Sequence, residues 1–329
     1  MANSSTAGND EQSKANKKLL DELQKIAVEE SPSGIPIIFG RDVIHGHSIV
    51  MSVPLASAAS FNPELITEGY RFVAKEAAKD GIHWTFSPMM DISRDPRWGR
   101  CVEGFGEDPY LSSKMAVASI KGFQGDDLSD KNSIAVCAKH YICYGAAEGG
   151  RDYANAEVSD YTLRNFYLKP FAESVKCGVA TVMSSFNEIS GQPLSSSRYL
   201  LYGLLKKELG FDGFIISDWA AVEQLVWQGV AQDKKDAARL AANAQLDMDM
   251  TDKCYIENLR ELSEEGKVSE DKINDMAYRV LSVKERLGLF ENPYIQTRNI
   301  DYGAYIKAAK KCSDESMVNF ILIHLRAHI

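Results

Sequence analysis

The stretch FIISDW, residues 214–219, is an uninterrupted apolar run that ends in a carboxylate and an indole. Strands that are buried on both faces are apolar throughout, whereas half-exposed strands alternate between apolar and polar residues. In a parallel sheet that closes into a barrel, the carboxyl ends of all strands lie on one face, where pockets form. The stretch therefore predicts a buried parallel strand with Asp218 and Trp219 at the mouth of a pocket.

Similar apolar runs recur along the chain and are separated by segments with helical spacing. We predict strands at 35–40, 82–88, 134–138, 179–184, 214–217 and 244–248. A helix between the first two begins after Asn62 and stops at Gly81. This alternation predicts an α/β fold, a (β/α)8 TIM-barrel-like domain that is incomplete at its N-terminal strand if only these strands exist. No GxGxxG or GxxxxGK motif follows a strand, which disfavours the nucleotide-binding folds.

Composition excludes several classes of function. The chain has 329 residues, of which 45% are hydrophobic and 25% charged, with a net charge of −9. Such a surface does not neutralise phosphates, so we expect no nucleic acid partner. No apolar stretch approaches the roughly 18 residues of a membrane span, so we expect no membrane association. The first twenty residues lack the apolar core of a signal peptide, and the chain as it stands is expected in the cytoplasm.

Cysteine and histidine give no sign of a metal site. The six cysteines form no CxxC pair and several fall in apolar segments, so we interpret them as buried thiols. His45 and His47 have a metal-like spacing without an apparent third ligand. We therefore predict no metal and no other cofactor.

The chain divides into three segments. Residues 1–17 are polar and are predicted to be a disordered lead-in, residues 18–300 form the barrel domain, and residues 301–329 form a C-terminal tail. The tail ends in an apolar stretch that favours self-association. A missing strand would also leave an open sheet edge that invites pairing, so a homodimer is an arrangement that we consider.

Polar side chains follow the apolar runs at the ends that a barrel would gather on one face. Asp42 follows 35–40, Lys139 and His140 follow 134–138, and Asp218 follows 214–217. A pyranose ring carries hydroxyl groups around an apolar face, so its site needs carboxylates, cations and an aromatic ring. The pattern therefore indicates a sugar site, although Lys139 alone would also suit a Schiff-base aldolase.

Lys139 and His140 are neighbours, and neighbours on a regular strand point to opposite faces. Both side chains reach one sugar only if the backbone is irregular at this point. We therefore expect a strained or cis peptide around His140-Tyr141.

Five strings carry a resemblance to a known family: DVIHG (42–46), DISRDPRWGRCVEGFGEDP (91–109), KHY (139–141), VMSSFN (182–187) and ISDW (216–219). They resemble the N-terminal barrel domain of glycoside hydrolase family 3 β-glucosidases. The resemblance implies a retaining β-glucosidase that hydrolyses nonreducing-end β-D-glucosyl residues of short glucosides. It implies that Asp218 is the nucleophile. It implies a sugar-binding set of Asp42, Arg100, Lys139, His140, Arg151, Met183, Phe186 and Trp219.

The chain also departs from the family pattern. Relatives have a segment before DVIHG that supplies the first barrel strand and helix. They continue into a second domain that supplies the acid/base glutamate, so residues 301–329 resemble the start of the linker to that domain. Phe186 stands where relatives often carry a tyrosine, so a hydrogen bond to the nucleophile is expected to be missing. The loop 143–153 lacks the histidine of related N-acetylhexosaminidases, which favours a glucoside as substrate.

The resemblance leaves the general acid unassigned. Glu148 and Asp152 are the nearest acids in the loop and are our candidates, and a loop of a second copy is another source. Three functions therefore stay open: a β-glucosidase, a β-xylosidase of the same family, and a glucose-binding, catalytically weak fragment that lacks its acid. Family members are often periplasmic or secreted, which leaves the localisation open as well.

Overall fold

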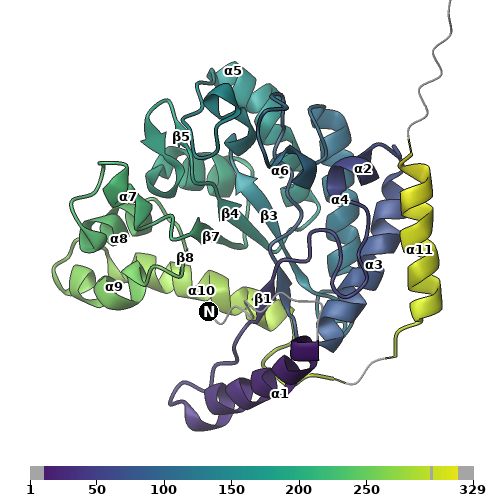
Figure 1. The fold of residues 1–329 in the computed structure, drawn as a ribbon. Helices are drawn as coiled ribbons and strands as arrows, with labels where there is room; N and C mark the ends of the chain where they lie inside the picture. Colours follow the sequence, from purple (N-terminus) through teal and green to yellow (C-terminus); the bar gives the residue numbers. More distant parts are fainter. Residues whose placement is uncertain (1–10, 297–298, 318–329) are drawn as a thin grey trace, which may run out of the picture.

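The computed structural model describes residues 11–296 and 299–317. Within them, six parallel strands form a curled sheet in the order β1-β2-β3-β4-β7-β8, and helices pack around its outside (Figure 1). The strands are β1 (Gly40–Arg41), β2 (Trp84–Thr85), β3 (Ala135–Tyr141), β4 (Thr181–Ser184), β7 (Phe214–Trp219) and β8 (Met248–Met250), and β5 (Glu188–Ile189) and β6 (Gln192–Pro193) form a small hairpin. The sheet is half of a barrel, which confirms the predicted barrel-like α/β fold.

The α-helices are α1 (Glu11–Lys25), α2 (Pro54–Ala58), α3 (Pro63–Lys79), α4 (Pro109–Gln124), α5 (Asp160–Thr162), α6 (Leu168–Lys176), α7 (Gln224–Trp227), α8 (Lys234–Asn243), α9 (Cys254–Glu264), α10 (Glu270–Arg286) and α11 (Tyr302–Glu315). The helical segments with other turns are η1 (Ile26–Glu30), η2 (Cys101–Glu103), η3 (Tyr144–Ala146), η4 (Glu148–Gly150), η5 (Leu163–Tyr167), η6 (Leu194–Ser196) and η7 (Tyr199–Glu208). As predicted, Asn62 caps α3: its side chain accepts a hydrogen bond from the Leu65 amide at 3.3 Å.

All six predicted strands have different bounds in the structure. The second, predicted at 82–88, is reduced to Trp84–Thr85, and the first and the last also change markedly. The first is reduced to Gly40–Arg41, because Pro36 has no amide hydrogen and the Ile37 amide donates to the Gln24 side chain at 2.7 Å instead of to a ladder. The last begins at Met248 rather than at residue 244, because the Ala244 amide still donates to the Leu240 carbonyl in the last turn of α8.

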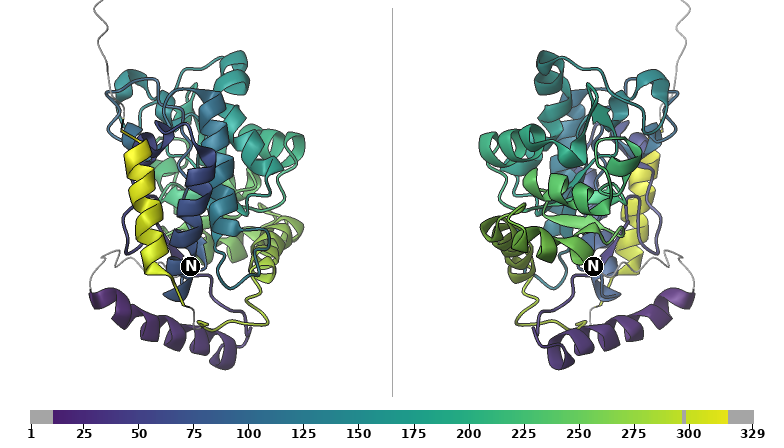
Figure 2. Two further views of the ribbon diagram at one scale, coloured as in Figure 1. Left: turned by 90° about the vertical axis from the view of Figure 1, so that its right-hand side faces the viewer. Right: turned by 90° about the vertical axis from the view of Figure 1, so that its left-hand side faces the viewer.

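The two ends of the described chain also differ from the predicted segments. Helix α1 begins at Glu11, so residues 11–17, expected in the disordered lead-in, are helical; residues 1–10 lie outside the described residues. In the predicted tail, α11 lies alongside α3 (Figure 2), where Tyr305 stacks on Phe72 at 5.3 Å between ring centroids. The apolar stretch at 318–329 lies outside the described residues.

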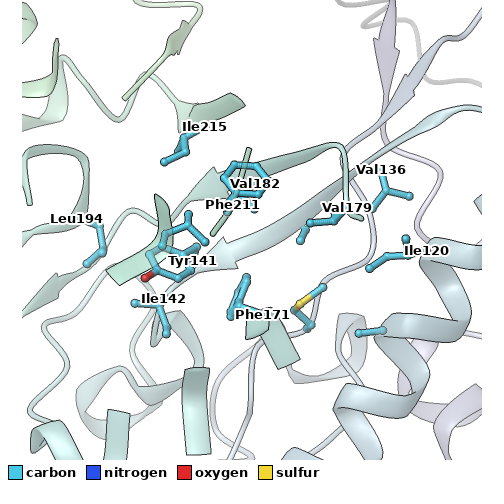
Figure 3. Packing of buried hydrophobic residues seen from close by; sticks show 14 of the residues in the cluster. Ile120, Val136, Tyr141, Ile142, Phe171, Val179, Val182, Leu194, Phe211 and Ile215 are labelled. Atoms are coloured by element: carbon cyan, nitrogen blue, oxygen red, sulfur yellow. The ribbon is translucent and has the colours of Figure 1, made fainter. Parts of the chain in front are cut away.

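Side chains on the strands alternate between two core clusters. Val136, Val182 and Ile215 belong to one cluster, which also contains Ile120 and Phe171 of the surrounding helices (Figure 3). The residues between them belong to a second cluster on the inner side of the curl: Ile38, Trp84, Phe86, Ala135, Cys137, Met183, Phe214, Ile216 and Met250. This period of two decides which residues at the strand ends face inward.

The close packing of α3 on α4 generates a stability prediction. A Cβ atom on Gly122 of α4 would lie 2.8 Å from both the Thr67 carbonyl oxygen and the Tyr70 Cβ of α3. We expect Gly122→Ala to lower the free energy of unfolding by about 1–3 kcal/mol, because the helices must separate. Gly203 of η7 is the matched control, since the nearest atom to its added Cβ is 3.7 Å away. Gly203→Ala should leave stability unchanged or raise it by up to ~1 kcal/mol. Urea unfolding measures both, and equal effects would contradict the packing described.

Candidate active site

The inner positions at the carboxyl ends of the strands carry charge. Counting by twos from Cys137 reaches Lys139, and counting by twos from Phe214 and Ile216 reaches Asp218. Asp42 directly follows β1, and its Oδ1 accepts a hydrogen bond from Lys139 Nζ at 2.8 Å. Lys139 and Asp218 are buried, while the Asp42 side chain is 53% exposed. The structure therefore brings three of the predicted residues to one end of the half-barrel.

His140 joins this group through an irregular part of β3. The peptide bonds Lys139-His140 and Tyr141-Ile142 are cis, and the pairing with β4 changes register between Ala138 and Tyr141. His140 Nε2 lies 3.4 Å from Asp218 Oδ2, so both neighbours, Lys139 and His140, serve one site. The predicted irregularity around His140-Tyr141 is confirmed.

Asp91 holds the imidazole of His140 in place. Its Oδ2 lies 2.8 Å from His140 Nδ1 and accepts a hydrogen bond from the His140 amide at 2.9 Å. Burial raises the pKa of Asp91 to about 7 and lowers the pKa of His140 to about 3. When Asp91 is ionised, the neutral imidazole donates its Nδ1–H to the carboxylate, and Nε2 is left free to accept a hydrogen bond.

The carboxylate of Asp218 is buried but set among positive groups. Oδ1 accepts a hydrogen bond from the Trp219 amide at 2.6 Å, whereas Oδ2 accepts none from the described residues. Burial raises the pKa of Asp218 above its usual range; His140, the Trp219 amide, Lys139 and Arg100 all act in the opposite direction. The result is a carboxylate with one oxygen held by the Trp219 amide and the other, without a hydrogen bond from the described residues, facing His140 Nε2 at 3.4 Å.

Arg100 approaches the same group from the segment between β2 and β3. It forms two hydrogen bonds with Glu103, at 2.8 and 2.9 Å, and its Nη2 lies 3.5 Å from His140 Nε2. Burial tends to raise the pKa of Glu103, but the bonds to Arg100 hold it below its ordinary value. The guanidinium also lies over the ring of Tyr144, 5.6 Å from its centroid. Arg100 is therefore fixed in direction before any ligand binds.

Aromatic rings form one side of the site. Phe186 is buried against Tyr144, at 5.7 Å between centroids, and against Tyr153, at 4.6 Å. Trp219 follows Asp218 directly and is 53% exposed. Rings of this kind suit the apolar face of a sugar or of a group attached to it.

The other predicted residues are not joined to the charged group by a hydrogen bond or ion pair within the described residues. Met183 is buried in the inner core cluster. Arg151 is exposed, and its Nε contacts the Glu148 carbonyl oxygen at 3.4 Å. Glu148 is exposed as well, and Asp152 accepts a hydrogen bond from Trp98 Nε1 at 2.9 Å. The sugar-binding role of Met183 and Arg151 and the acid role of Glu148 and Asp152 stay predictions.

Sequence reasoning missed three residues of the site. Asp91 follows the apolar run at 82–88 by the same rule that singled out Asp218, and that rule could have found it. Tyr144 and Tyr153 lie in the loop after β3, where spacing alone gives no signal. Each of them contacts Phe186.

In the described part of the chain, no three His, Cys, Asp or Glu side chains converge as metal ligands do. Asp80 Oδ2 accepts a hydrogen bond from His47 Nε2 at 2.8 Å, while His45 is exposed. Among the same residues, no helix combines the length and the apolar character needed to cross a membrane.

The fold and the site define a barrel-type α/β domain with a cluster of charged side chains at the carboxyl ends of its strands. Comparison with known proteins agrees. The model of the glycosyl hydrolase family 3 N-terminal domain matches residues 4–283. The chain belongs to this family.

Individual relatives cover most of this chain. It is 41% identical over 260 residues to the periplasmic β-glucosidase of Salmonella typhimurium, a match that covers 79% of this chain and 34% of that protein. It is 34% identical over 314 residues to a putative β-xylosidase of Formosa agariphila, with 93% and 42% covered. The structure of the Listeria innocua β-glucosidase in complex with isofagomine superposes with a TM-score of 0.88 at 37% identity, covering 91% of this chain and 43% of that one. The chain thus spans less than half the length of these relatives.

Two buried lysines allow a test of which charges serve the site and which serve stability. Lys139 pairs with the half-exposed Asp42, whereas Lys206 donates to both carboxylate oxygens of Asp247, whose side chain is 0% exposed. Removing Lys206 leaves a buried carboxylate without its main partner, so we expect Lys206→Met to cost about 3–5 kcal/mol.

The matched variant Lys139→Met should cost less than about 1 kcal/mol, because water can solvate Asp42 once the lysine is gone. The free energy of unfolding in urea gives both values. A larger loss for Lys139→Met than for Lys206→Met would show that Lys139 is part of the structural framework.

Proposed function

We propose that this chain forms the sugar site of a retaining β-glucosidase and that Asp218 is its nucleophile. One observation carries the proposal: the Asp218 carboxylate is buried at the carboxyl end of β7, its Oδ2 has no hydrogen-bond partner within the described residues, and the cations Lys139 and Arg100 act on it. A nucleophilic carboxylate must be ionised, and nearby cations favour the ionised form.

The remaining groups suit a glucosyl residue. Asp42 and Lys139 present an acceptor and a donor side by side, and His140 Nε2 offers a further acceptor when its Nδ1–H points to Asp91. Trp219 provides an exposed ring for the C–H face. Structures of the Listeria innocua β-glucosidase hold glucose or laminaribiose, which supports a β-glucoside here. A β-xyloside is the alternative substrate, since β-xylosidases are also among the relatives.

In the reaction that we propose, one oxygen of Asp218 attacks the anomeric carbon. The bond from that carbon to the aglycone oxygen breaks, and a general acid supplies the proton that this oxygen takes. Water then hydrolyses the glycosyl-aspartate ester and gives its proton back to the same acid/base group. Glu148 and Asp152 are the candidates for that group within the described loop.

A trapping experiment tests the nucleophile. We expect 2,4-dinitrophenyl 2-deoxy-2-fluoro-β-D-glucoside to label Asp218, because its good leaving group needs little protonation and its fluorine slows hydrolysis of the ester. Peptide mass spectrometry locates the label. Asp218→Asn should abolish labelling, while Asp212→Asn, an exposed residue two positions before the same strand, should not. A label on another residue would contradict the assignment.

The pH dependence of that labelling follows from the burial of Asp218. Only the ionised carboxylate attacks, so the labelling rate should rise with pH, with a midpoint above the ordinary value of about 3.9. Lys139 acts to lower the pKa of Asp218, so Lys139→Met should move the midpoint to higher pH. A midpoint that does not respond to Lys139→Met would rule out this electrostatic role.

A second function, sugar binding with weak turnover, is favoured by one observation. Asp152 is already bound to Trp98, and Glu148 is exposed, so neither acid is held at the charged group. Slow cleavage of the dinitrophenyl glucoside with no cleavage of cellobiose would support this function. Cleavage of both substrates that is lost in Glu148→Gln or Asp152→Asn would identify the acid and exclude it.

A further inference from the structure

Tyr153 belongs to the aromatic side of the site and has no part in the reaction proposed above. Its ring is 4.6 Å from Phe186 and 6.2 Å from Tyr144, measured between centroids, yet the residue is 54% exposed. One side of the ring is therefore supported by buried aromatic rings and the other is open. Trp219, which directly follows Asp218, is exposed to nearly the same extent, at 53%.

The loop that carries Tyr153 is tied to the rest of the site. Asp152 accepts a hydrogen bond from Trp98 Nε1 at 2.9 Å, and Trp98 is buried. Within the loop, the Ala154 amide donates to the Arg151 carbonyl at 3.1 Å. Tyr153 itself has a φ of 65°, a conformation that residues with a Cβ atom adopt rarely. A side chain that is held in such a conformation beside a site is a reason to look for a function.

Charged groups of the site act on the pKa of Tyr153. Burial raises the pKa of Tyr153, and Asp152 and Asp218 raise it further, while Arg100 opposes them. The phenol therefore keeps its proton at neutral pH. It lies within electrostatic reach of the Asp218 carboxylate.

The burial of the charged groups indicates which part of a bound glucoside Tyr153 would contact. Lys139, His140 and Asp218 are all at most 8% exposed, so a glucosyl residue that touches them must enter deeply. The group that leaves with the glycosidic oxygen then points back toward solvent. Tyr153 and Trp219 are the half-exposed rings at that outer level.

We propose that Tyr153 is a specificity-determining residue that stacks on the aglycone and gives the site a preference for glucosides of planar aromatic alcohols. Phe186 and Tyr144 support its ring from behind, and the Asp152–Trp98 hydrogen bond fixes the loop. This inference rests on the proposed function, because it assumes a glucosyl residue bound at Asp218. It adds the chemical class of the leaving group, which neither the charged residues nor the relatives determine.

The test compares two glucosides that resist hydrolysis: 4-nitrophenyl 1-thio-β-D-glucoside and methyl 1-thio-β-D-glucoside. Titration calorimetry measures their dissociation constants for the full chain and for its variants. Tyr153→Ala should weaken binding of the aryl ligand about tenfold and leave the methyl ligand within about twofold, because only the aryl group reaches the ring. Tyr153→Phe keeps the ring and should match the wild type on both.

Controls separate this role from a structural one. Tyr153→Gly suits a positive φ and replaces Tyr153→Ala if the latter unfolds. Tyr278→Ala removes a tyrosine of α10 that is 69% exposed, more than Tyr153, and should change neither constant. Equal losses for both ligands, or no loss for the aryl ligand in Tyr153→Ala, would overturn the inference. If the wild type binds neither ligand, the proposed function itself fails.

Discussion

The site depends on the period-two alternation of side chains along β3 and β7. Hydrogen-bonded register pairs Cys137 with Thr181 of β4 and Thr181 with Phe214, so the inward positions of the two strands are matched across the sheet. Two residues beyond Cys137 lies Lys139, and four beyond Phe214 lies Asp218. A slip of one residue in either strand would turn its charged side chain toward the helices. The buried apolar clusters on both sides of the sheet prevent such a slip, because they fix which residues face which way.

Charges at this end of the half-barrel are placed at a cost to stability. Burial disfavours the ionised form of Asp218, and the surrounding cations offset only part of that effect, since its pKa remains raised. Lys139 is buried, but its partner Asp42 is exposed to water, whereas both Lys206 and Asp247 are buried. Because Asp42 is exposed, it can still accept a hydrogen bond from a ligand's hydroxyl group. The difference between the two lysines separates binding groups from the framework that holds them.

The strands were predictable because each is a short apolar run, and the charged tips were predictable because each follows such a run. Boundaries were less accurate where a local contact took a backbone group away from the sheet, as Gln24 does at Ile37. The irregular backbone near His140 was predictable because the adjacent residues Lys139 and His140 were both expected to contact one sugar. Tyr153 could not be predicted, because its place depends on the contact between Asp152 and Trp98, which are 54 residues apart in the chain.

The central claim is that Asp42, Lys139, His140 and Asp218 together hold one glucosyl residue with its anomeric carbon at Asp218. A crystal structure of the chain with glucose bound tests it most directly. We predict an Asp218 oxygen about 3–3.5 Å from the anomeric carbon, the separation of a near-attack geometry, with sugar hydroxyls bound to Asp42 and Lys139. Glucose bound elsewhere, or bound with its anomeric carbon turned away from Asp218, would contradict it.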